Sequence, residues 1–148
     1  MHKKLIIKII LIYIYLFANS YSMQSNFFDK AKKLYDEKKF EDSKILFERD
    51  LVFNPKNDKS YLYLAKIFNK KKDIEEYENN LNNVLLLKPQ NDEALYLLTL
   101  LKIEQSDYST AKDLIEKFSL VCKSFCNKKD EVEEIFSKQN LENDKVSN

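Results

Sequence analysis

The strongest constraint in this 148-residue sequence is the interval of 34 residues between its only two prolines, Pro55 and Pro89. Each proline follows a stretch, 47–54 or 81–88, that contains no other proline and carries apolar residues at helical spacing. Proline cannot continue a helix, and the residue before it is biased out of the helical region. A helix stopped by proline therefore occurs twice, at a period typical of helix-turn-helix repeats.

Apolar residues recur at helical spacing from residue 25 onward, and no stretch shows the strict alternation of a half-buried strand. The pattern predicts helices that begin near residues 25, 41, 58, 73, 91 and 107, and a seventh from about Lys129 to Gln139. The seventh has one apolar side and one charged side, which is what the last helix of a stack requires. The predicted fold class is all-α, built from repeated helix pairs.

The absence of glycine argues against several classes of protein. Tight hairpins, phosphate-binding loops and dinucleotide-binding motifs depend on glycine for their backbone geometry. The net charge is +1 with acidic and basic residues interspersed, so no basic face for nucleic acid stands out. The only histidine is His2, and a chain that loses its first residues cannot use histidine for catalysis or metal binding. We therefore expect no enzymatic activity, no cofactor, no metal and no nucleic-acid partner.

Residues 1–22 have the features of an export signal. A short basic head precedes an apolar stretch, Leu5–Ala18, which is interrupted only by Lys8, and small residues suit cleavage after Ser20 or Ser22. The apolar stretch is shorter than the roughly 20 residues needed to cross a bilayer. We expect export, to the periplasm in a bacterium or into the secretory pathway otherwise. The alternative is an uncleaved anchor that associates with the membrane through residues 5–18.

With the two prolines placed at position 32 of a unit, the chain resembles the tetratricopeptide repeat family, whose unit is a 34-residue pair of antiparallel helices. The units are then 24–57, 58–91 and 92–125, followed by a capping helix at 128–140 and a flexible tail at 141–148. The family's main packing positions are filled by Phe27, Tyr61 and Leu95 at position 4, Ala31, Ala65 and Thr99 at position 8, Phe40, Ile74 and Tyr108 at position 17, and Phe47, Leu81 and Ile115 at position 24. The resemblance implies a right-handed α-α superhelical repeat that binds protein or peptide.

Several positions depart from the family pattern. Tyr77 stands at position 20, where the family has a small residue, and position 27, which is also usually small, holds Asp50, Val84 and Phe118. The third unit has Lys123 in place of the proline. We expect the packing to deviate from the family's at these points.

The resemblance also implies a concave groove lined by the first helix of each unit. Carried over position by position, the expected lining residues are Phe28, Lys32, Tyr35, Leu62, Lys66, Asn69, Tyr96, Leu100 and Ile103. Such a groove suits an extended or helical peptide with apolar anchors and some negative charge. Because Phe28 and Leu62 occupy position 5, the pattern with which some relatives clamp the carboxyl-terminal tail of a chaperone is missing. The alternative is that the apolar members of this set only pack against neighbouring helices.

Cys122 and Cys126 lie four residues apart, near the end of the sixth helix. Cysteines of exported proteins usually pair, and four residues of helical rise span about 6 Å, which a disulfide tolerates. We expect a disulfide that joins the sixth helix to the seventh, where the third proline is missing. Two thiols are the alternative, and a redox-active pair is disfavoured because the spacing is not Cys-x-x-Cys.

Taken together, these features predict an exported, non-catalytic repeat protein that binds another protein or a peptide, such as a scaffold or adaptor in cell-envelope assembly. The alternative is a membrane-tethered structural subunit held in a complex by an uncleaved amino-terminal helix.

Overall fold

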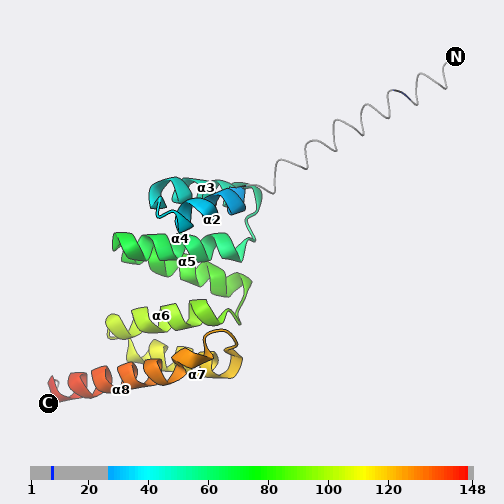
Figure 1. The fold of residues 1–148 in the computed structure, drawn as a ribbon. Coiled ribbons are helices and arrows are strands. Elements are labelled where there is room, and N and C mark those ends of the chain that lie inside the picture. The colour runs from blue at the N-terminus through cyan, green and yellow to red at the C-terminus, as the bar shows by residue number, and fades with distance from the viewer. Residues whose placement is uncertain (1–7, 9–26, 147–148) are drawn as a thin grey trace. The chain divides into compact units, whose positions relative to one another are not determined.

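The computed structural model describes Lys8 and residues 27–146, with side chains as far as Gln139 in the last helix. Residues 27–146 contain only helices and turns, which confirms the predicted all-α fold (Figure 1). The elements are α2 (Phe27–Asp36), α3 (Phe40–Phe53), α4 (Asp58–Lys71), α5 (Ile74–Leu87), α6 (Asp92–Glu104), α7 (Tyr108–Val121), the 3-10 turn η1 (Cys126–Lys128) and α8 (Lys129–Val146). The predicted export signal, apart from Lys8, lies outside the described residues. No helix within the described part of the chain is long and apolar enough to span a membrane.

The chain divides into two compact units, Met1–Asn57 and Asp58–Asn148. The first contains the helix pair α2–α3. The second contains the pairs α4–α5 and α6–α7, which follow one another in Figure 1, and α8, which packs on α6 and α7. All three pairs fall within the predicted repeat boundaries. The last helix continues to Val146, through most of the segment predicted as a flexible tail.

The turn inside each helix pair has the same backbone geometry. Lys38, Lys72 and Ser106, which are spaced by the repeat period, have φ angles of 62°, 60° and 60°. The amide of the next residue donates back to a carbonyl five residues earlier, in the pairs Lys39–Leu34 (2.9 Å), Asp73–Phe68 (3.1 Å) and Asp107–Lys102 (2.9 Å). This is the Schellman end of a helix, where glycine is the usual left-handed residue. A chain without glycine therefore places lysine or serine in a conformation that costs about 1–2 kcal/mol for a residue with a Cβ atom.

Side-chain caps start the following helices in the second unit. Asp73 accepts a hydrogen bond from the amide of Glu76 (3.3 Å), and Asp107 accepts one from Thr110 (3.1 Å). Asn91 caps α6 in the same way. Such caps satisfy amides that the first turn of a helix leaves without a partner.

The core of the first unit depends on small residues where its two helices meet. Ala31 of α2 and Ser43 of α3 are both fully buried, and the Ser43 hydroxyl donates to the Ala31 carbonyl at 2.8 Å. Phe47 is also fully buried beside them. The contact between Ser43 and the backbone of α2 shows why positions 8 and 20 of the unit require small residues.

Two of the positions that depart from the family pattern have defined structural roles. Asp50 is 2% exposed, and its two carboxylate oxygens accept from Asn54 Nδ2 (3.1 Å) and Asn57 Nδ2 (2.6 Å), so it fastens the turn around Pro55. Tyr77 of the second unit is 5% exposed. Its burial, together with the charge of Glu104, raises the pKa of Tyr77 to about 12, so the hydroxyl stays protonated.

Candidate functional site

The residues predicted to line the groove come from α2 in the first unit and from α4 and α6 in the second. In α2, the Phe28 and Tyr35 rings are half-buried and lie 5.7 Å from Phe47 and 5.4 Å from Phe40, measured between ring centroids. These rings therefore help to pack α2 on α3, as the alternative interpretation expects. Lys32 is exposed and forms an ion pair with Asp36 at 2.8 Å.

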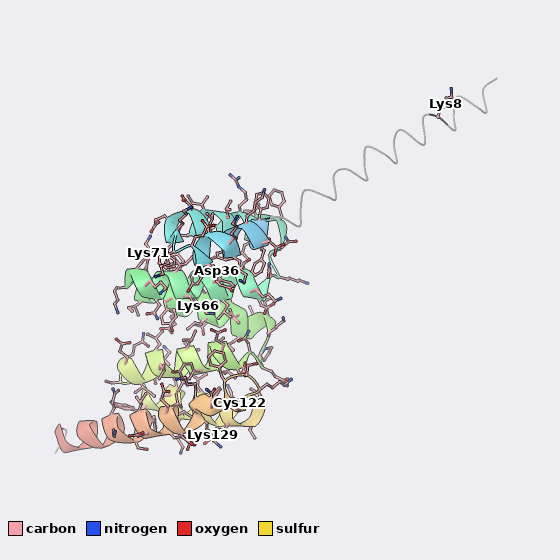
Figure 2. All side chains as sticks on the ribbon, in the orientation of Figure 1. Lys8, Asp36, Lys66, Lys71, Cys122 and Lys129 are labelled. Atoms are coloured by element: carbon pink, nitrogen blue, oxygen red, sulfur yellow. A yellow bond between two sulfur atoms is a disulfide. The ribbon has the colours of Figure 1, made fainter. Side chains whose placement is uncertain are left out.

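Lys66, a predicted groove residue of α4 that is labelled in Figure 2, contacts both α4 and α6. Its Nζ atom lies 2.6 Å from Glu93 Oε1, which links α4 to α6, and 5.1 Å from the centroid of the Tyr63 ring. Both side chains of the ion pair are about one-quarter exposed. A ligand carboxylate could therefore reach Lys66 by competing with Glu93.

The remaining predicted residues of α4 and α6 differ in exposure. Asn69 is exposed and Leu100 is half-buried, so both contribute to the surface. Leu62 is 8% exposed and Ile103 is 1% exposed. Both side chains are buried, so a ligand on this face would contact them little or not at all.

Tyr96 is covered by the segment that follows α7. It is 8% exposed, and its ring lies 5.8 Å from that of Phe125 and 6.2 Å from that of Phe118. Its hydroxyl donates to Glu131 Oε1 of α8 at 3.0 Å. Burial and the hydrogen bond to Glu131 raise the pKa of Tyr96, while hydrogen bonds from Lys128 and Tyr96 lower the pKa of Glu131.

Asp92, one turn before Tyr96 on α6, holds the same segment. Its Oδ2 atom accepts hydrogen bonds from the backbone amides of Lys123 (2.7 Å), Ser124 (2.6 Å) and Phe125 (3.0 Å). Desolvation acts to raise the pKa of Asp92, but the three amides outweigh it and hold the pKa below its usual value. Sequence reasoning missed this role because the partners are more than 30 residues away and donate through the backbone, which leaves no residue-type signal.

The sulfur atoms of Cys122 and Cys126 are joined in a disulfide, with the Cα atoms 5.1 Å apart. Cys122, labelled in Figure 2, follows the last residue of α7, and Cys126 begins η1. Cys126 is exposed, whereas Cys122 is half-buried. The bond closes the loop between α7 and α8 at the place where the earlier units have their prolines.

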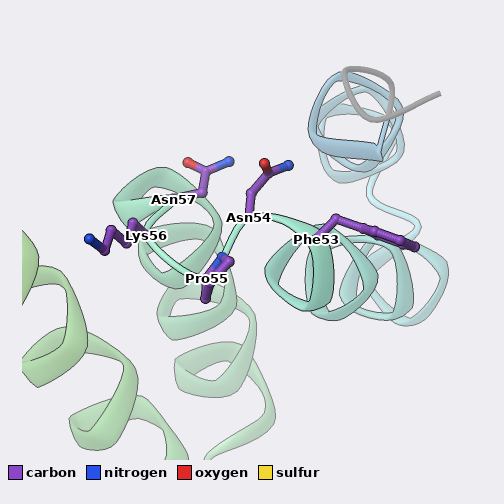
Figure 3. A pocket seen from close by; sticks show the side chains of 5 residues that line it. All are labelled: Phe53, Asn54, Pro55, Lys56 and Asn57. Atoms are coloured by element: carbon purple, nitrogen blue, oxygen red, sulfur yellow. The ribbon is translucent and has the colours of Figure 1, made fainter. Parts of the chain in front are cut away.

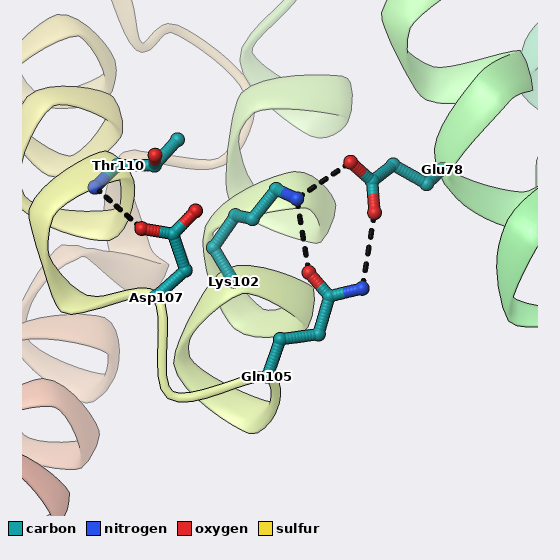
Figure 4. A network of polar contacts seen from close by, with 5 residues as sticks. All are labelled: Glu78, Lys102, Gln105, Asp107 and Thr110. Carbon is teal, nitrogen blue, oxygen red and sulfur yellow. Dashed lines mark hydrogen bonds and ion pairs between the residues drawn. The ribbon is translucent and has the colours of Figure 1, made fainter.

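A polar network links α5 to α6 in the second unit (Figure 4). Lys102 Nζ lies 2.5 Å from Glu78 Oε1 and 2.9 Å from Gln105 Oε1, and Gln105 Nε2 donates to Glu78 Oε2 at 3.0 Å. The hydrogen bonds from Lys102 and Gln105 lower the pKa of Glu78. The network connects the second helix of one repeat with the first helix of the next.

Two surface hollows lie at the turns that contain the prolines, away from the predicted groove residues. The first is lined by residues 53–57 (Figure 3), and the second by residues 87–91. Both occupy the same positions in their repeats, so they result from the turn geometry. The described residues contain no cluster of histidine, cysteine and carboxylate side chains that could hold a metal ion.

No protein-family model matches the sequence, and no curated protein matches it either. Solved structures do share its fold. The type III secretion chaperone SycD of Yersinia enterocolitica, in complex with a peptide of the translocator YopD, has a TM-score of 0.71 at 10% identity, and the alignment covers 82% of this chain and 95% of that one. The second TPR domain of human RPAP3, in complex with an HSP70 peptide, has a TM-score of 0.65 at 20% identity over 80% and 97% of the two chains.

A third similar structure is the TPR domain of Sgt2 from Aspergillus fumigatus, with a TM-score of 0.63 at 13% identity over 84% of this chain and 82% of that one. The helix pairs therefore define a helical-repeat protein. Its fold is that of tetratricopeptide repeat domains, as the sequence resemblance implied.

Proposed function

We propose that this chain is a non-catalytic module that binds a peptide segment of another protein on the face formed by α4 and α6. The supporting observation is the half-buried Lys66–Glu93 pair, which lies on the helices that carry the exposed Asn69 and the half-buried Leu100. A peptide carboxylate takes the place of Glu93 at Lys66, and an apolar side chain contacts Leu100. The peptide complexes of SycD and the RPAP3 domain give this proposal precedent within the fold.

Binding can be tested with a display library of 12-residue peptides selected on the immobilised protein. The selected peptides should combine acidic with apolar residues. The double variant Lys66→Ala, Asn69→Ala should weaken their affinity by at least about tenfold, or 1.4 kcal/mol. The matched control replaces the exposed Lys112 and Asn82 by alanine on α7 and α5. Equal loss in both variants, or none in either, would contradict the proposed face.

We further propose that the protein is exported and acts as a scaffold or adaptor in the cell envelope. The support is the sequence pattern of residues 1–22. Mass spectrometry of the amino terminus of protein isolated from its own cells should find a chain that begins after Ser20 or Ser22. An intact Met1 would instead favour the second candidate function, a membrane-tethered structural subunit, for which the apolar stretch Leu5–Ala18 is the supporting feature.

A further inference from the structure

The disulfide loop lies over one face of α6 in the second unit. Asp92 and Tyr96, one helical turn apart, both contact it: Asp92 accepts from its backbone, and Tyr96 packs against Phe125. Tyr96 is one of the residues expected to line the ligand groove, yet it is 8% exposed. The chain itself therefore covers this part of the expected groove.

The disulfide and the Asp92 contact share the same few residues. The three amides that donate to Asp92 Oδ2 belong to Lys123, Ser124 and Phe125, which are the three residues between the two cysteines. Three consecutive amides can meet one oxygen atom only if the backbone is folded into a tight turn. The disulfide closes that turn, so the bond and the contact with α6 support each other.

We propose that the Cys122–Cys126 disulfide is a redox-controlled latch over the Asp92–Tyr96 face of α6: the oxidised loop covers the face, and the reduced loop leaves it open to a ligand. The opened face presents the carboxylate of Asp92 and the ring of Tyr96, whose hydroxyl donates to Glu131 of α8. This face fits a peptide segment as its ligand. The peptide donates backbone amides to Asp92 and places an apolar side chain where Phe125 lies in the oxidised protein. Only this last step rests on the proposed peptide-binding function.

The exposure of Cys126 makes the bond accessible to a dithiol reductant. A thiolate of the reductant attacks Cys126 Sγ, the disulfide breaks, and Cys122 leaves as a thiolate that takes up a proton. The second thiol of the reductant, as its thiolate, then attacks the mixed disulfide and releases the Cys126 thiolate, which is protonated. Two electrons pass to the protein, and the reductant becomes a disulfide. The opened loop keeps its attachment to α7 and α8 through the chain.

The latch can be tested without a ligand, so its failure is distinguishable from failure of the proposed function. Hydrogen exchange of the amides of Lys123, Ser124 and Phe125 should become at least about tenfold faster when the full-length protein is reduced. In the variant Cys122→Ser, Cys126→Ser, which has no thiols, tetranitromethane should nitrate Tyr96 several times faster than in the oxidised wild type. Peptide mass spectrometry locates the nitrated ring.

Two further measurements separate a local latch from general loosening. Tyr77, which is 5% exposed in the core of the same unit, should remain unmodified in every form. The variant Asp92→Asn keeps the disulfide but weakens the contact between the loop and α6. Under oxidising conditions it should accelerate both hydrogen exchange of the loop amides and nitration of Tyr96. Unchanged loop exchange and nitration on reduction would overturn the latch. Simultaneous nitration of Tyr77 would overturn it too, because the disulfide would then hold the core and not one face.

Discussion

Replacing the left-handed residue in each intra-repeat turn by glycine should stabilise the protein. Lys38, Lys72 and Ser106 have φ near 60° and exposed side chains, so their replacement removes a Cβ atom and little packing. The left-handed conformation costs about 1–2 kcal/mol for a residue with a Cβ atom. Glycine avoids that cost, but it gives the unfolded chain more freedom, which costs about 0.5–1 kcal/mol.

The first effect exceeds the second, so each substitution should raise the free energy of unfolding by about 0.5–1 kcal/mol. The three sites lie in different repeats, so their effects should add to about 2 kcal/mol. The matched controls are Lys38→Ala, Lys72→Ala and Ser106→Ala, which keep the Cβ atom in the same conformation. These alanine variants should gain much less.

Urea unfolding followed by circular dichroism at 222 nm gives the global effect, and hydrogen exchange assigns it to a helix pair. Lys38→Gly should increase protection in α2 and α3, whereas Lys72→Gly and Ser106→Gly should do so in the second unit. If the glycine variants are no more stable than the alanine variants, the left-handed turns are not a source of strain, and the reasoning is refuted.

Three other substitutions test the packing and the polar contacts. Asp50→Ala installs the family's small residue but removes the acceptor of two partly buried hydrogen bonds. A loss of about 2 kcal/mol should outweigh the gain of about 0.7 kcal/mol in helix propensity. Thermal unfolding that shows a more stable variant would be evidence against this. Phe118→Ala should cost about 3–5 kcal/mol in urea unfolding, because the ring is fully buried. A double-mutant cycle with Glu78→Gln and Lys102→Met should give a coupling of about 1 kcal/mol. The pKa of Glu78 is lowered in the folded state. The stabilisation should therefore be present above the unfolded pKa near 4.5 and disappear as the pH falls through the folded pKa. A coupling energy that persists at pH 2 would contradict an ion pair between Glu78 and Lys102.

The repeat architecture could be predicted because it depends on features that the sequence displays directly. Apolar spacing and the interval between Pro55 and Pro89 locate the helix pairs, and Asp73 and Asp107 mark two helix starts. The left-handed turns could not be predicted. Glycine usually marks such a conformation, but the residues at these positions are Lys38, Lys72 and Ser106.

The candidate site was less predictable, because repeat position gives the side of a helix but not what else covers that side. Phe28 and Lys66 lie on the expected helices, but Phe28 packs on its own helix pair and Lys66 is held by Glu93. Tyr96 is covered by residues about 30 positions away along the chain. Contacts of this kind are set by the tertiary fold, so burial at these positions could be learned only from the structure.

Two of the departures from the repeat pattern lie where the chain fastens its turns by polar contacts or a disulfide. In the first unit Asp50 replaces a small residue, and its carboxylate ties down the two asparagines that flank Pro55 and Lys56. In the third repeat the proline is missing, and Asp92 together with the disulfide holds the turn instead. Proline restricts a turn permanently, whereas a disulfide does so only while it is oxidised. Among the three turns that follow a helix pair, the one without proline is therefore the one whose order can respond to redox conditions, and it is also the turn that covers Tyr96.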